Sequence, residues 1–172
     1  MLPKLSPHEN QYGAPVAQFI PTEVTGVFAL DASHRAIWRH AEPYLRVRSN
    51  DAHTLYAYGI ARALCEATEG ADPGVVLPAI LLHDTGWSQV PQDLVLKAIS
   101  PSGGDPELVL LHEREGVRIA RQILLELDYP LAVVDEVADI VFTHDSMKAA
   151  KSINDAVVKD ADKIWRVSPH GI

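Results

Sequence analysis

Four histidines and two aspartates in this sequence are of the types that bind transition metals, and they are spread along most of the chain. They are His53, His83, Asp84, His112, His144 and Asp160. Apart from the adjacent pair His83-Asp84, each interval between them is long enough for one helix and its connection. Imidazole nitrogens and carboxylate oxygens together suit Mn, Fe, Zn, Co or Ni better than Ca or Mg. Six such groups are too many for one tetrahedral structural zinc, but they match two metals that share a carboxylate.

The elements that must position these residues are predicted to be helices. Periodicity, capping residues, prolines and glycines indicate helices near 31–41, 50–69, 73–84, 91–99, 105–128, 130–145 and 153–167, and no segment alternates like a strand. The first helix is expected to end near Pro43. Residues 1–24 carry four prolines and are expected to form an extended arm, with a single domain over 25–172. The chain stops soon after the last candidate ligand, which suggests a piece of a longer protein.

Helical spacing places the candidate ligands on apolar faces. His53 is followed two turns later by Ile60, and His112, His144 and Asp160 have apolar neighbours three or four positions away in the same manner. A single inward histidine is more often an ordinary core residue. A carboxylate on a buried stripe, however, is costly unless it is paired or bound to a metal. The joint pattern therefore favours a metal centre in the core.

The composition indicates an ordinary globular chain in a reducing compartment. Hydrophobic residues make up 47% of the 172 residues, and the formal net charge is -8. This charge argues against a nucleic-acid or anionic-membrane surface, which needs a basic face. The single cysteine, Cys65, cannot form an internal disulfide, and residues 1–20 lack the pattern of a signal peptide. A cytoplasmic location is expected, and a homo-oligomer is left open.

The segments around these residues resemble the HD-domain superfamily of metal-dependent phosphohydrolases. The matching segments are LPAILLHDTGW, which contains His83 and Asp84, and VVKDADKIW, which contains Asp160. The resemblance covers about residues 28–167 and implies an all-α helical bundle, the HD domain, with the metal site in its core. It also implies that these three residues and His53 bind a first metal.

Two further histidines match the dinuclear branches of the superfamily. They are His112, in HEREGVRIA, and His144, in VFTHD. In those branches the aspartate of the HD pair bridges two metals, which makes Asp84 the expected catalytic residue. The branches include cyclic-dinucleotide phosphodiesterases, diadenosine tetraphosphate hydrolases and mixed-valent diiron oxygenases. The resemblance thus implies two divalent transition metals, with Fe or Mn favoured and Zn, Co, Ni or Mg as alternatives.

The chain departs from the superfamily three residues after Asp84. Many HD enzymes carry a lysine or a glutamate at this position, whereas this chain has Trp87. A tryptophan cannot act as a general base or bind a phosphate by charge, so we expect it to form an apolar wall of the substrate pocket. The phosphate would then be bound by other cations. The candidates are Lys148, Lys151, Lys163 and Arg48.

Three functions are compatible with these residues. The favoured one is a metal-dependent phosphohydrolase that cleaves a phosphate ester or anhydride of a small molecule or nucleotide with a metal-activated water. The first alternative is a mixed-valent diiron oxygenase of the inositol or phosphonate type, because the same six ligands could hold iron. The second is a non-catalytic HD regulatory module, which the complete set of ligand-type residues disfavours. The sequence also lacks the GYP-type continuation of the cyclic-dinucleotide subgroup.

Overall fold

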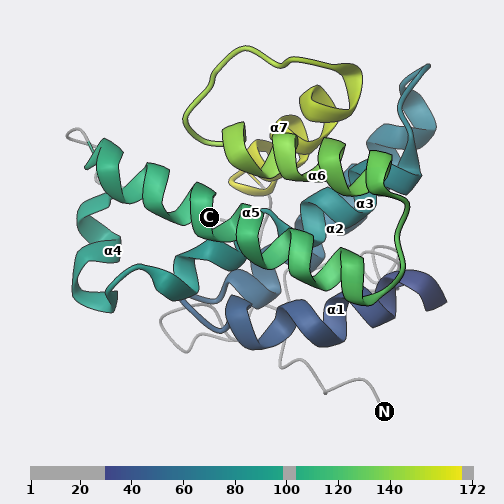
Figure 1. Cartoon of the computed structure of the whole chain (residues 1–172). Coiled ribbons are helices and arrows are strands. Elements are labelled where there is room, and N and C mark those ends of the chain that lie inside the picture. The colour runs from purple at the N-terminus through teal and green to yellow at the C-terminus, as the bar shows by residue number, and fades with distance from the viewer. Residues whose placement is uncertain (1–29, 99–103, 168–172) are drawn as a thin grey trace, which may run out of the picture.

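The computed structural model describes residues 30–98 and 104–167, and this part of the chain is helical without strands (Figure 1). Seven α-helices and one short 3-10 helix follow one another within these described residues. They are α1 (Ala32–Leu45), α2 (Asn50–Ala67), α3 (Pro73–Leu82), η3 (Thr85–Gln89), α4 (Gln92–Ala98), α5 (Pro106–Glu126), α6 (Leu131–Thr143) and α7 (Ile153–Trp165). The expected all-α class is confirmed. The proposed arm over 1–24 lies outside the described residues.

Several helices begin at a residue whose side chain caps the first turn. The Asp72 carboxylate accepts a hydrogen bond from the backbone N–H of Gly74 at 2.8 Å, with Pro73 in the first turn of α3. Asp105 caps α5 in the same way, and the Ser152 hydroxyl oxygen accepts from the first turn of α7. These side chains satisfy N–H groups that have no partner within the helix, so the starting points follow from the sequence.

Helix α1 continues past the proline that was expected to end it. Pro43 lies inside α1, which runs to Leu45. A proline in a helix removes one backbone hydrogen bond and crowds the preceding turn. Here it stands in the last turn, and Ala41 and Leu45 on either side are fully buried. The free energy gained by burying these two residues outweighs the lost hydrogen bond. Periodicity alone did not indicate that the helix continues past Pro43.

Helix α3 forms the centre of the domain. Every residue from Val75 to Leu82 is buried, and the helix packs against α1, α2, α6 and α7. A helix with apolar residues on all sides is expected in such a central position. The pair His83-Asp84 follows directly at its C-terminal end and therefore lies inside the bundle.

Two glycines allow close packing around α5: Gly86 lets η3 lie directly on the backbone of α5, and Gly116 leaves room for a side chain of α6. A Cβ atom added to Gly86 would stand 1.8 Å from the carbonyl oxygen of His112 and 2.5 Å from the nitrogen of Gly116. A Cβ on Gly116 would reach the Val141 side chain at 3.0 Å. This close approach brings the residues around the HD pair next to His112, and α5 in turn packs along α6.

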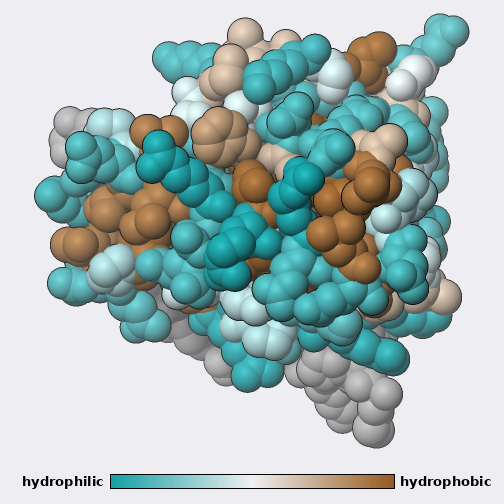
Figure 2. Space-filling view, in the orientation of Figure 1, coloured by the Kyte–Doolittle hydropathy of each residue, from teal (hydrophilic) through white to brown (hydrophobic). Residues whose placement is uncertain are grey.

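The face of the molecule that carries α5 is mostly hydrophilic, but apolar patches interrupt it at the left, near α4, and at the right (Figure 2). Exposed apolar residues include Leu96 on α4 and Leu125 near the end of α5. No helix among the described residues is long and apolar enough to cross a membrane.

The contact between η3 and α5 predicts a marked difference between two glycine substitutions. Gly86→Ala should lower the free energy of unfolding by at least about 2 kcal/mol, because the atoms in its way are backbone atoms that cannot turn aside. Gly74→Ala is the control, since its nearest obstacle is a side-chain oxygen of Asp72 at 3.1 Å. It should change the free energy by less than about 1 kcal/mol. Urea denaturation measures both, and equal stability of the two variants would contradict the close contact.

Candidate metal centre

Four histidines from four helices meet inside the bundle as two facing pairs. The Nε2 atoms of His53 and His83 are 3.0 Å apart, and those of His112 and His144 are 3.3 Å apart. His53 comes from α2, His83 from the end of α3, His112 from α5 and His144 from the end of α6. All four are buried. The convergence that helical spacing predicted is therefore present.

The carboxylate of Asp84 lies between the two histidine pairs. Its Oδ2 atom is 3.5 Å from Nε2 of both His53 and His83, and its Oδ1 atom is 3.6 Å from Nε2 of His144. One oxygen thus faces each pair. This is the arrangement expected of a carboxylate that is shared between two adjacent groups of ligands.

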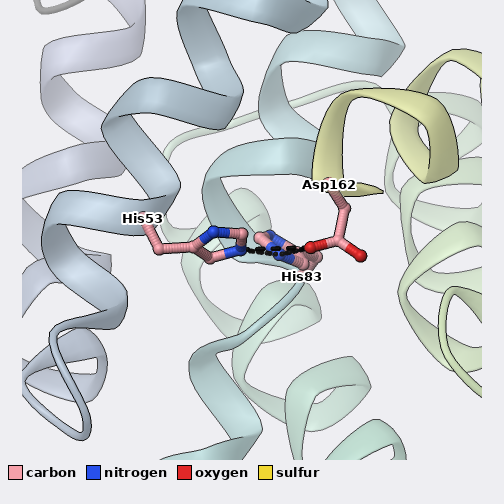
Figure 3. Close-up of side chains that lie close together, drawn as sticks. All are labelled: His53, His83 and Asp162. Atoms are coloured by element: carbon pink, nitrogen blue, oxygen red, sulfur yellow. Dashed lines mark hydrogen bonds and ion pairs between the residues drawn. The ribbon is translucent and has the colours of Figure 1, made fainter. Parts of the chain in front are cut away.

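Besides Asp84, the aspartate that adjoins the pair His53 and His83 is Asp162, and not Asp160. Asp162 on α7 is buried, with Oδ1 3.2 Å from Nε2 of His53 and 3.7 Å from Nε2 of His83 (Figure 3). Asp160 is exposed and does not belong to the group formed by His53, His83 and Asp162. Two positions on a helix differ by about 200° in direction, so the two aspartates point to nearly opposite sides. The choice of Asp160 from the sequence was wrong.

A third carboxylate adjoins the second pair. Asp145, the residue after His144, has Oδ2 3.6 Å from Nε2 of His112 and 3.7 Å from Nε2 of His144. Its side chain is 30% exposed, against 11% for Asp84 and 9% for Asp162. Asp145 is therefore the most open of the three carboxylates in this cluster.

The spacing and chemistry of these donors fit a divalent metal. Two nitrogen ligands bound to one ion at about 2.1 Å stand roughly 3.0–3.4 Å apart in octahedral or tetrahedral geometry. The separations of 3.0 and 3.3 Å within the histidine pairs agree with this range. His83 and His144 use Nδ1 as a donor to the carbonyl oxygens of Ile80 and Val141, at 2.8 Å each, which directs Nε2 into the cluster.

The protonation of the cluster also indicates a place for cations. Burial alone raises the pKa of Asp84, but the neighbouring histidines outweigh it and hold the pKa well below its usual value. Burial lowers the pKa of His144, yet Asp145 and Asp84 raise it to about 10. Burial and the nearby His144 lower the pKa of His112 to about 3. His144 is therefore protonated and His112 neutral, so the imidazole of His112 accepts a hydrogen bond from His144. A metal ion would replace the proton between them.

The profile of the HD domain family matches residues 50–166, which include every residue of the cluster. The chain belongs to the HD domain family. Proteins with this domain are generally metal-dependent hydrolases of the phosphohydrolase type, and the buried His and Asp groups are suited to divalent metals. Comparison of the chain with curated proteins and with solved structures gave no match.

In this HD domain, Trp87 supports the cluster and does not form an open wall. It is 2% exposed, its indole N–H donates to Oδ1 of Asp84 at 3.1 Å, and its ring stacks on His112 with centroids 3.9 Å apart. Both its polar and its flat surfaces are thus engaged by residues of the cluster. The expectation that Trp87 lines a substrate pocket has to be replaced by a positioning role.

The cations chosen from the sequence are all exposed: Lys148, Lys151, Lys163 and Arg48. Lys163 lies about one turn after Asp160, which is exposed and outside the cluster. Lys148 lies three residues after Asp145, in the connection between α6 and α7. A further cation that the sequence analysis missed is Arg166, whose guanidinium nitrogen is 3.7 Å from Oδ2 of Asp162. The binding of substrate by any of them stays a prediction.

Sequence signals for the missed carboxylates exist but are ambiguous. The inward face of α7 is partly polar, since Asp155 and Lys159 form a buried ion pair on it, two turns and one turn before Asp162. Ile164, four residues after Asp160, is 41% exposed and does not belong to a buried stripe. Asp145 carries a clearer signal, because it repeats the histidine-aspartate order of the HD pair after another apolar helix.

Asp162 and Asp160 provide a matched pair for a first test of the site. Asp162→Asn should lower the metal content of the purified protein and weaken metal binding at least about tenfold, because the amide removes the negative charge next to His53 and His83. Asp160→Asn should keep the metal content of the wild type. Elemental analysis after dialysis measures both, and an equal loss in the two variants would refute the assignment.

Trp87→Phe separates the hydrogen bond of the indole from its stacking. The phenyl ring can still lie on His112, but no N–H reaches Asp84. Loss of such an outer contact typically costs roughly 10–100-fold in metal affinity or activity. We expect a decrease in this range, with the thermal melting curve nearly unchanged. Wild-type metal affinity in Trp87→Phe would show that the indole N–H does not orient Asp84.

Proposed function

We propose that this HD domain is a phosphohydrolase that binds two divalent metals and cleaves a phosphate ester or anhydride of a small molecule or nucleotide. The observation that supports it best is the position of Asp84, with one carboxylate oxygen toward each histidine pair. His53, His83 and Asp162 would hold one metal, and His112 and His144 the other. Asp84 would be shared between them.

Two divalent metals held by these residues would supply a nucleophilic water at neutral pH and would stabilise the charge of a phosphoryl group. The residues of this chain contribute the geometry. The backbone carbonyls of Ile80 and Val141 fix the orientation of His83 and His144, and Trp87 fixes Asp84. The helices behind them exclude bulk water, which strengthens electrostatic interactions inside the site.

An anionic substrate needs local positive charge, because the chain as a whole has a net charge of -8. Lys148 has the best support among the lysines, since it follows Asp145, the most exposed carboxylate of the cluster. Arg166 adjoins the opposite carboxylate, Asp162. An arginine can bind a phosphate with two parallel hydrogen bonds, whereas a lysine acts as a point charge. Both are proposed as phosphate-binding residues.

The diiron oxygenase remains the second candidate, because four imidazoles and several carboxylates also form a ligand set that iron accepts. A regulatory module without catalysis is less well supported. All four histidines and Asp84 point their donor atoms into one cluster, and that arrangement costs stability if nothing binds there.

Hydrolysis and oxygenation are distinguished by the source of the oxygen that enters the product. The Mn²⁺-loaded protein is incubated without O₂ in ¹⁸O-labelled water with bis(4-nitrophenyl) phosphate or 4-nitrophenyl phosphate. We expect release of nitrophenol and one ¹⁸O atom in the phosphate product. Asp84→Ala should lower this rate by at least about a thousandfold and release metal, because the shared ligand is removed.

Asp93→Ala, a change on the exposed surface of α4, is the control and should retain wild-type hydrolysis. Hydrolysis by Asp84→Ala at the wild-type rate would show that the cluster is structural. No hydrolysis by the wild type, together with consumption of O₂ by the iron-loaded protein, would favour the oxygenase.

A further inference from the structure

The chain contains two histidine-aspartate pairs with the same local structure. His83-Asp84 follows α3, and His144-Asp145 follows α6. In each pair the histidine is the C-cap residue, in right-handed helical conformation, and its Nδ1 lies 2.8 Å from the carbonyl oxygen three residues earlier. Helices α3 and α6 pack against each other, so the two pairs lie side by side.

The aspartates of the two pairs relate to their histidines in nearly the same way. Asp84 Oδ2 is 3.5 Å from Nε2 of His83, and Asp145 Oδ2 is 3.7 Å from Nε2 of His144. Asp145 Oδ2 also lies 3.6 Å from Nε2 of His112. A carboxylate that served only as a helix cap or as a surface group would not be expected to face two imidazole nitrogens at once.

From this repetition we propose that Asp145 is a ligand of the second metal. The inference rests on the proposed dinuclear function and deepens it. With Asp145, each metal has two histidines, one aspartate of its own and a share of Asp84. The aspartate of its own is Asp162 for the first metal and Asp145 for the second.

A buried glutamate holds Asp145 in place. Glu113 is fully buried, and its Oε1 accepts hydrogen bonds from the backbone N–H groups of Asp145 and Ser146, at 3.1 and 2.8 Å. Glu113 follows His112 directly on α5. The same turn of this helix therefore carries the proposed ligand His112 and the residue that fixes the backbone of Asp145. Burying a carboxylate costs free energy unless it is hydrogen-bonded, and these two bonds offset part of that cost. The other oxygen, Oε2, is buried without a hydrogen-bond partner among the described residues. Glu113 is therefore a positioning residue of the second metal.

The third carboxylate changes the charge and the access of the centre. Asp84, Asp145 and Asp162 together nearly neutralise two divalent ions and leave a small positive charge, which suits a hydroxide or an anionic substrate. Since the Asp145 side chain is 30% exposed, the cluster is most open to solvent on this side. A substrate phosphate would therefore approach it from the side of Asp145.

Titration of the metal-free full chain with Mn²⁺, followed by EPR, tests the role of Asp145. The wild type should bind two ions. Asp145→Asn should retain one ion with wild-type affinity and bind the second at least about tenfold more weakly, because only one terminal carboxylate is lost. Asp139→Asn, on the exposed side of α6, is the matched control and should bind two ions like the wild type.

A pair of changes at Glu113 tests the inference without altering a ligand. Glu113→Ala removes the acceptor for the N–H groups of Asp145 and Ser146. It should lower the affinity for the second ion as much as Asp145→Asn does. Glu113→Gln keeps an acceptor oxygen and should restore binding of the second ion. Melting curves show whether each variant folds, and if Asp145→Asn does not fold, the Glu113 pair decides.

The outcomes separate this inference from the proposed function. Two ions of unchanged affinity in Asp145→Asn would overturn the role of Asp145 and leave the dinuclear hydrolase intact. A single ion in the wild type would overturn the dinuclear site and this inference together. Weak binding of the second ion in both Glu113→Ala and Glu113→Gln would overturn the positioning role of Glu113.

Discussion

The buried carboxylate of Asp84 is the constraint on which the rest of the structure depends. A negative charge inside an apolar bundle is unstable unless opposite charges and hydrogen bonds surround it. Here imidazoles from both sides and the indole N–H of Trp87 provide that environment. The same surroundings hold the pKa of Asp84 below its usual value, so the residue is an anion at neutral pH. An anion held between two facing pairs of nitrogen donors is the electrostatic basis for binding cations here.

The helices can be understood as the means of enclosing this charge. Helix α3 is apolar on all sides and ends at the HD pair, so its burial carries Asp84 into the core. Gly86 lets η3 rest on the backbone of α5, which brings His112 and Trp87 to the same place. Because α2, α5, α6 and α7 each supply at least one group, the cluster exists only when all of them are packed. Metal binding and folding of the domain are therefore coupled.

The sequence predicted the helices and the four histidines because both depend on patterns along one element. Apolar periodicity, caps and prolines act locally, so the segments are found without tertiary information. The choice between Asp160 and Asp162 depends on which face of α7 is inward, and Lys159 makes that face partly polar. The roles of Trp87 and Glu113 were not accessible, since they arise from contacts between residues that only the packed bundle brings together. Conflicts between pattern and placement of this kind are concentrated at sites that bind ligands.

The two histidine pairs are alike in their donor atoms but differ in their surroundings, because the His53 pair is more enclosed than the His112 pair. His53 stands against the ring of Trp165, with centroids 4.4 Å apart, and adjoins the enclosed Asp162. His112 is covered on one face by Trp87, but its carboxylate neighbour Asp145 reaches solvent. A ligand set closed on all sides favours a permanently held ion, whereas one with an open side can accept a further ligand. Under the proposed function, the His53 pair would hold its metal permanently, and the His112 pair would present its metal to a substrate.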